Sequence, residues 1–282
     1  MNKIVTLLFI VFVAFRAQAQ FGHQTKEILE KIKETELVVI LSDDSTDMYN
    51  TSIQKAIHDY WKLTPAKFVK AAAATEYTKK KEGYTYLIMV KSAGAKVKCK
   101  CSTSELEMTG IVLTTKYKKG KIALTDIAAS ALIDGKFGAT QEEYDAQFIR
   151  AVQFLTNFFD YVNDAENDKA IAYETMQRKY PGDKTLAEGK KLLIDKKMVD
   201  EKQKEAIEKT WDGEVEYVDA KEIAKAILTQ NEEIVYWAAP MFELDTHRMF
   251  IMAKDGKIVF YEVTGPEKNM VSAKDVSRLM KK

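Results

Sequence analysis

Two hydrophobic patterns alternate along the chain, and each predicts one kind of element. The apolar run 37–41, bounded by polar residues, is typical of a buried strand. Apolar residues then recur at helical spacing over 53–61, which predicts an amphipathic helix. Short apolar runs at 67–69 and 84–88 predict two further strands. This part of the chain therefore reads as strands alternating with helices.

The same succession recurs in the second half of the chain. Segment 205–211 repeats the Ala, Ile and Trp of segment 55–61 at the same spacing. Apolar segments at 191–194, 216–218 and 234–238 take the places of the three predicted strands. A fixed succession that occurs twice indicates a duplicated structural unit.

Each copy ends on a predicted hairpin. The segment 254–258, Lys-Asp-Gly-Lys-Ile, matches 118–122, Lys-Lys-Gly-Lys-Ile, and Asp-Gly between apolar strands is a strong hairpin signal. The last match has a shorter offset, so we expect an insertion in the first copy between about 91 and 108.

Strand–helix–strand successions imply parallel pairing with right-handed crossovers, whereas the closing hairpin adds antiparallel strands. The predicted fold class is therefore α/β (or α+β), with two tandem βαβαβββ-type repeats that have mixed sheets and are joined by a long helix. The boundaries are a signal peptide at 1–19, repeat 1 at 35–135, the connecting helix at 140–165 and repeat 2 at 185–282.

The connecting helix has an unusually broad apolar arc. Thr140 and Glu143 have capping-box spacing at its start. Its apolar stripe, widened by two further phenylalanines, consists of Phe148, Val152, Leu155, Phe159 and Val162 with Phe154 and Phe158. So broad an arc predicts burial on more than one side, between the two copies.

The first twenty residues have the three zones of a signal peptide. Lys3 precedes the apolar run 4–15, and Ala17-Gln18-Ala19 has the small-x-small pattern before a cleavage site. We expect cleavage between Ala19 and Gln20; an N-terminal membrane anchor is the alternative, although the run is shorter than the ~20 residues that a span needs. No cysteine lies at the cleavage point, and no later run could span a membrane, so we expect a periplasmic or secreted protein without a transmembrane segment in the mature chain.

The charge balance excludes one class of partner. The chain has 43 Lys and Arg against 42 Asp and Glu, a net charge of +1, and loss of Lys3 and Arg16 with the signal peptide leaves −1. Nucleic-acid binding requires a basic face, so we predict no nucleic-acid partner. The basic residues are nearly all lysines, whereas bidentate recognition of phosphate or carboxylate favours arginine.

The loop after the first predicted strand is the candidate ligand site. Asp43, Asp44 and Ser45 lie at the carboxyl end of that strand, where open α/β sheets bind ligands. Such oxygens suit a hard cation or a hydroxyl-rich ligand. The alternative is that Thr46 or Asp47 caps the following helix and that the other residues are solvated.

Other residues with possible chemistry predict no catalytic site, cofactor or metal site. Cys99 and Cys101 are the only cysteines, and they lie in the insertion without a nearby histidine. Free or paired thiols, a soft-metal site and a redox pair are the possible readings. His247 is expected just before a strand, with a structural or incidental role. Ser52 and Lys55 fit Ser-x-x-Lys, but the other elements of penicillin-recognising enzymes do not occur.

The repeated strand–helix–strand pattern, with Trp61 and Trp211 closing equivalent helices, resembles uncharacterised exported bacterial proteins with duplicated α/β units. The resemblance implies export and an α/β fold, and it assigns no activity. The leading hypothesis is a non-enzymatic binding or interaction module of the bacterial envelope, with its ligand between the copies. Alternatives are a periplasmic hydrolase whose site is assembled from scattered residues, and a structural partner in an envelope complex. The expected partner is accordingly an unknown small ligand or an envelope protein.

Overall fold

The structure is a computed structural model of the chain. The residues that it describes are 26–78, 83–98, 103–117, 127–133, 140–163, 182–242, 245–265 and 270–280. The predicted signal peptide, Cys99, Cys101 and the predicted turn at Gly120 lie outside these residues.

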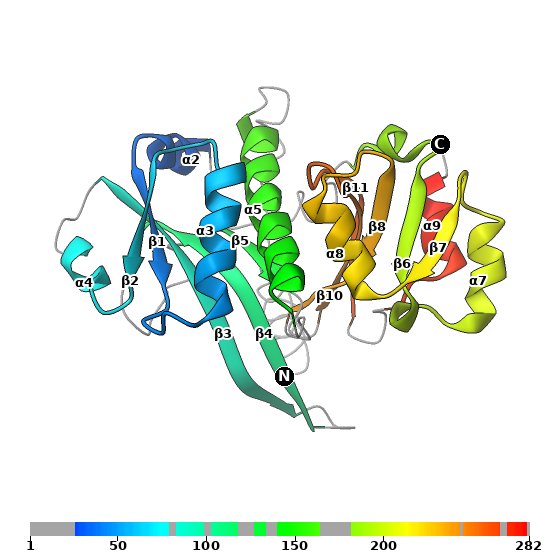
Figure 1. Cartoon of the computed structure of the whole chain (residues 1–282), viewed down its shortest axis with the longest axis horizontal. Helices are drawn as coiled ribbons and strands as arrows, with labels where there is room; N and C mark the ends of the chain where they lie inside the picture. Colours follow the sequence, from blue (N-terminus) through cyan, green and yellow to red (C-terminus); the bar gives the residue numbers. More distant parts are fainter. Residues whose placement is uncertain are drawn as a thin grey trace, which may run out of the picture.

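The N-terminal unit is a mixed sheet with strand order β2-β1-β3-β4-β5. β1 pairs in parallel with β2 and β3, whereas β4 is antiparallel to both β3 and β5. Its strands are β1 (Glu36–Leu41), β2 (Ala66–Lys70), β3 (Tyr84–Lys98), β4 (Thr103–Thr114) and β5 (Ile127–Ile133). Helix α3 (Met48–Tyr60) forms the first crossover and α4 (Ala74–Tyr77) lies in the second (Figure 1).

The C-terminal unit repeats this topology. Its strand order is β7-β6-β8-β10-β11, in which β6 pairs in parallel with β7 and β8, and β10 is antiparallel to β8 and β11. Its elements are β6 (Lys191–Asp195), α7 (Glu201–Glu208), β7 (Val215–Val218), α8 (Ala220–Leu228), β8 (Ile234–Ala238), β9 (Met241–Phe242), β10 (Asp245–Met252), β11 (Ile258–Thr264) and α9 (Ala273–Met280), with short 3₁₀ turns η3 (Lys184–Ala187) and η4 (Lys196–Met198). The predicted pair of tandem α/β repeats is confirmed.

The first copy differs from the second in the length of one hairpin. β3 has 15 residues and β4 has 12, whereas the equivalent β8 and β10 have 5 and 8. The region of the expected insertion thus belongs to a long extension of the β3–β4 hairpin, which projects beyond the rest of its unit (Figure 1).

Helix α5 (Gln141–Asn163) lies between the two units (Figure 1). Phe148 and Phe159 are fully buried, and one continuous core joins α5 to residues of both sheets, such as Leu87 in β3 and Tyr236 in β8. Burial on both sides explains why the apolar arc of this helix is so broad, as predicted. Glu143 donates its backbone N–H to Thr140 Oγ1 at 3.3 Å, which caps the start of the helix. Ile32 of α2 (Lys26–Lys33) joins the same core.

The equivalent tryptophans anchor the first helix of each copy. Trp61 and Trp211 are each 5% exposed. Trp61 packs edge-on against Phe159 at 6.2 Å between ring centroids, and Trp211 stacks on Phe250 at 6.1 Å. Each indole N–H also has an acceptor, Thr64 Oγ1 for Trp61 and the Lys190 carbonyl for Trp211. Both side chains therefore serve the core.

Candidate functional site

A polar cleft of about 350 Å³ lies where α5 meets the ends of both units. Four separate segments line it: the end of α3, the middle of α5, the residue after the C-terminal turn of α8, and the β10–β11 turn. Its lining residues are Asp59, Tyr60, Gln153, Thr156, Asn157, Gln230, Lys254 and Asp255. Most of these side chains are neutral amides or hydroxyls.

The end of α8 directs one amide across the cleft. Gln230 has a φ of +50°, a left-handed conformation that terminates the helix, and its N–H donates to the Ile227 carbonyl at 3.0 Å. From this position Gln230 Nε2 donates to Tyr60 Oη at 2.6 Å. A side chain of the C-terminal unit thereby contacts one of the N-terminal unit.

Polar residues of α5 hold the other walls in place. Asn157 Nδ2 donates to the Asp255 carbonyl at 3.1 Å, and Gln153 Nε2 donates to the Lys254 carbonyl at 3.5 Å. On the opposite side, Thr156 Oγ1 donates to the Tyr60 carbonyl at 3.4 Å. The same helix thus fixes the spacing between the two halves of the cleft.

Asp59 and Lys254 of the cleft lie at exposed positions and Asp255 is half-buried, and each of the three has a partner of opposite charge or a histidine. Lys254 Nζ donates to Glu232 Oε2 at 2.7 Å. This hydrogen bond and the attraction between the charges raise the pKa of Lys254 and lower the pKa of Glu232. Asp59 Oδ1 lies 2.8 Å from His58 Nδ1. Neutral hydrogen-bonding groups therefore remain as the main partners for a ligand.

Gly256 lets the β10–β11 turn approach α5. Its φ is +69°, and a Cβ at this position would lie 2.7 Å from Gln153 Cβ and 2.8 Å from Gln153 Oε1. Both the backbone conformation and the close approach require glycine. The Asp-Gly pair that predicted the hairpin thus also shapes the cleft.

We expect Gly256→Ala to destabilise the protein more than Gly189→Ala. Gly189 has a nearly identical φ of +68° but nothing within 4 Å of an added Cβ, so its substitution adds only about 1–2 kcal/mol of backbone strain. Gly256→Ala must also displace Gln153, which adds roughly 1–3 kcal/mol. Urea unfolding of both variants measures the difference; equal losses would show that the contact with Gln153 has no energetic consequence.

The predicted acidic loop is held together by its own hydrogen bonds. Asp44 Oδ1 accepts from Thr46 N at 2.9 Å and from Thr46 Oγ1 at 2.7 Å, and these bonds lower the pKa of Asp44. Asp43 Oδ1 accepts from Ala72 N at 2.8 Å, whereas Asp47 accepts from Tyr49 N at 3.0 Å and caps α3. Ser45 is exposed. Ligand binding by Asp43, Asp44 and Ser45 stays a prediction.

The Ser-x-x-Lys sequence belongs to a clamp between α3 and α5 in which Ser52 and Asp145 are buried and Lys55 is exposed. Ser52 is fully buried and donates to Asp145 Oδ1 at 2.7 Å, and Lys55 Nζ donates to Asp145 Oδ2 at 3.1 Å. Burial acts to raise the pKa of Asp145, but hydrogen bonds from Gln141, Ser52 and Lys55 outweigh it and the pKa is lowered. Ser52 is inaccessible to a substrate in this arrangement, which gives the motif a packing role.

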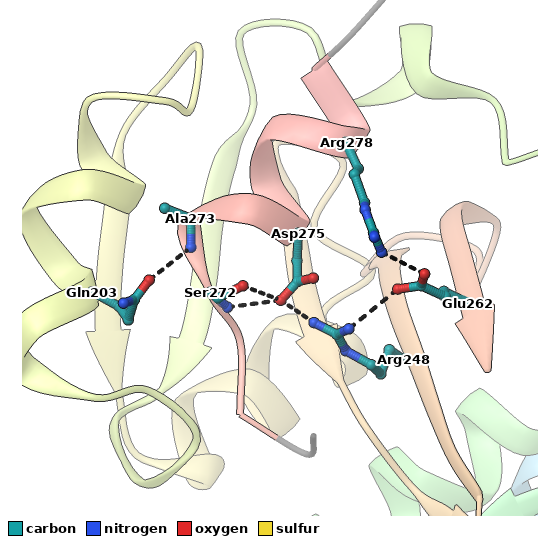
Figure 2. A network of polar contacts seen from close by, with 7 residues as sticks. All are labelled: Gln203, Arg248, Glu262, Ser272, Ala273, Asp275 and Arg278. Atoms are coloured by element: carbon teal, nitrogen blue, oxygen red, sulfur yellow. Dashed lines mark hydrogen bonds and ion pairs between the residues drawn. The ribbon is translucent and has the colours of Figure 1, made fainter. Parts of the chain in front are cut away.

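A buried ion network attaches α9 to the C-terminal sheet (Figure 2). Arg248 on β10 pairs with Asp275 on α9, and its Nη1 donates to Glu262 Oε2 at 3.1 Å. Asp275 Oδ2 also accepts from Ser272 N at 2.9 Å and from Ser272 Oγ at 2.6 Å, which completes the cap of α9. Arg278 Nη1 lies 2.5 Å from Glu262 Oε1. The two arginines and two carboxylates balance in charge, so the network serves structure.

The placement of His247 before a strand is wrong. His247 lies within β10, is 1% exposed, and has Nδ1 2.6 Å from Tyr261 Oη. Burial lowers its pKa from 6.5 to about 3. The sequence does not show that the strand begins at residue 245, because the residues that follow, 246–248, are polar and are buried only in the folded structure.

We expect acid to destabilise the protein through His247. Its folded-state pKa is lower than its unfolded value, so the stability from the neutral ring is fully present above pH 6.5 and is lost as the pH falls towards 3. The free energy of unfolding should fall by about 1.4 kcal/mol per pH unit below pH 6.5. Between pH 6.5 and about pH 5 carboxyl groups contribute little, so urea unfolding in this window measures the histidine.

Two substitutions check this assignment. His247→Gln should remove most of the slope between pH 6.5 and 5, whereas His58→Gln should leave it unchanged because the His58 side chain is 86% exposed. A slope that persists in His247→Gln would contradict the assignment.

Comparison of the chain with protein-family models, curated protein sequences and solved structures finds no match. Within the described residues, no three His, Cys, Asp or Glu side chains are grouped so that they could hold a metal ion. None of the described helices combines the length and the apolar character needed to cross a membrane.

Proposed function

We propose that this chain is an exported, non-enzymatic binding protein of the bacterial envelope that holds a small ligand in the cleft between its two α/β units. The predicted signal peptide at 1–19 supports export. The observation that carries the proposal is the cleft of about 350 Å³, which side chains of both units and of α5 line together. Ligand sites lie preferentially at such junctions between units, and this volume falls within their usual range.

The chemistry of the lining favours an uncharged ligand rich in hydroxyl groups, such as a saccharide. The side-chain oxygens of Gln153, Asn157 and Gln230 can accept hydrogen bonds from a ligand, because the hydrogen bonds described above use only the N–H groups of these amides. Tyr60 adds an aromatic ring and a hydroxyl group, and an aromatic face suits the apolar face of a sugar ring. The lining includes no arginine, which is the residue favoured for phosphate or carboxylate ligands.

A thermal-shift experiment on residues 20–282 tests the proposal. The probes are neutral oligosaccharides, among them glycan fragments of peptidoglycan, with a nucleotide and an amino-acid mixture for comparison. A ligand at about 100 times its dissociation constant adds about 2.7 kcal/mol of stability, which raises the melting temperature measurably. A panel in which no saccharide raises the melting temperature would contradict the saccharide assignment.

Variants locate the site. Asn157→Leu and Gln230→Gly should abolish the shift; glycine suits the left-handed φ of residue 230, so that variant removes only the side chain. Gln54→Ala removes an exposed amide of α3 outside the cleft and should leave the shift unchanged. If the ligand still raises the melting temperature of both cleft variants, its binding site lies outside the cleft.

One observation favours a structural partner as the second candidate. Phe68 on the edge strand β2 is 38% exposed, and it points away from the small core that Val69 forms with Val38 and Ile40 on the other face of the sheet. Large exposed apolar groups on a sheet edge are typical of contact with another chain. Loss of envelope-protein capture in Phe68→Asp, with retained ligand binding in the cleft, would support this alternative.

A further inference from the structure

Arg150 of α5 is a buried cation without a carboxylate partner among the described residues. It is 6% exposed, and its only hydrogen bond among the described residues runs from Nη2 to the Leu132 carbonyl at 3.2 Å. No ion pair to it exists within the described part of the chain. Arg248, the other buried arginine, contacts two carboxylates. A guanidinium has five N–H donors and stays charged in proteins, so most of the hydrogen-bonding capacity of Arg150 is unused.

The side chain lines a small crevice between the units, next to the polar cleft. Segments from β5, α5, β10 and the β10–β11 turn form its wall, namely Ala131, Leu132, Ala151, Phe154, Met249, Ile251 and Gly256. Its volume is about 10 Å³, which is room for roughly one water-sized occupant. Apart from Arg150, the side chains that line the crevice are apolar, so they do little to screen the positive charge of the Arg150 guanidinium.

Among the described residues, the neighbouring titratable groups supply no negative charge. Burial raises the pKa of the Tyr236 phenol above its usual range, although the charge of Arg150 acts to lower it. His247 and Tyr261 lie on the same face of the C-terminal sheet as Tyr236 and form a hydrogen-bonded pair. Burial keeps the His247 ring neutral. An uncompensated charge in such surroundings strongly destabilises a fold, and an anion at the guanidinium removes this penalty.

We propose that the crevice between the two units binds one small monovalent anion at the guanidinium of Arg150. Chloride has the required charge and is the anion closest to this size, whereas gluconate is far too large for the volume. The anion contacts β5 and α5 on one side and β10 on the other, so it stabilises the packing of the two units. This site is independent of ligand binding in the polar cleft.

Melting temperatures in different sodium salts at equal ionic strength test the proposal. The wild-type chain 20–282 should melt roughly 2 °C or more higher in chloride or bromide than in gluconate. Arg150→Met should lose this difference and should match or exceed the wild-type melting temperature in gluconate, because an apolar isostere of a buried charge is often neutral or stabilising. Formate that reproduces the chloride effect would identify a site open to small carboxylates, whereas a response to halide alone would identify a halide site.

Controls separate the site from general salt effects. Lys274→Met removes an exposed positive charge and should keep the wild-type difference between chloride and gluconate. An anomalous diffraction peak beside Arg150 in a bromide-soaked crystal would support the assignment directly. A wild-type melting temperature that is equal in chloride and gluconate, or a chloride effect of the same size in Arg150→Met, would overturn it.

Discussion

Replacing Asp275 by alanine is expected to lower the free energy of unfolding by about 3–5 kcal/mol. The Arg248 side chain is 4% exposed and the Asp275 side chain 3%, so the substitution leaves a charge in the core with only the partly exposed Glu262 as a counter-charge. It also removes the acceptor that holds Ser272 at the start of α9 (Figure 2). Urea unfolding of Asp275→Ala at pH 7 measures the loss.

A double variant distinguishes the cost of an unpaired charge from the loss of packing. Asp275→Leu combined with Arg248→Met removes both charges and should recover most of the lost stability, since apolar replacement of a buried pair is often neutral. Asp212→Ala, at an exposed position, should change stability by less than about 0.5 kcal/mol. A double variant no more stable than Asp275→Ala would show that the network does not act through charge pairing.

The succession of strands and helices could be predicted because the same hydrophobic pattern occurs in both halves of the chain. Where one copy is ambiguous, the other supplies the comparison: the Asp255-Gly256 turn between β10 and β11 has its sequence counterpart at Gly120. The sense of strand pairing follows from the same pattern, since consecutive parallel strands need crossovers whereas hairpins join antiparallel strands. The two sheets share one topology.

The two copies cover their sheets differently, and sequence patterns do not show why. The second helix of the N-terminal unit, α4, has 4 residues, whereas its counterpart α8 has 9 and packs on α5. One face of the C-terminal sheet is therefore covered by α8 together with α5, and α5 directly follows the N-terminal sheet in the chain. Only the breadth of the apolar arc of α5 indicated this arrangement in advance.

The cleft could be predicted as a place but not as a set of residues. Tyr60 and Gln230 are 170 residues apart and meet because Tyr60 ends α3, Gln230 follows the end of α8, and both helices pack on α5. Amide and hydroxyl side chains form no recognisable sequence motif. The left-handed turn at Gln230 could not be predicted either, because the residue there is not a glycine. The acidic loop is predicted as a site because its carboxylates directly follow a strand, although local hydrogen bonds account for Asp44 and Asp47.

The second large effect is expected at Phe159, which should cost about 3–5 kcal/mol when replaced by alanine. Phe159 is fully buried, packs against Trp61 and lies 5.8 Å from the Phe158 ring. Because the core around α5 includes both sheets, the loss should lower the stability of the whole molecule. Urea unfolding followed by tryptophan fluorescence and by circular dichroism should give one shared transition at a lower urea concentration.

Phe68→Ala is the matched control, since it removes the same side chain from a position that is 38% exposed. Its cost should stay below about 1 kcal/mol. Two separated transitions in Phe159→Ala, one reported by Trp61 in the N-terminal unit and the other by Trp211 and Trp237 in the C-terminal unit, would contradict a shared core. A single transition would instead mean that the cleft walls stay in register only while both units are folded, because Asn157, Gln153 and Thr156 on α5 hold both walls.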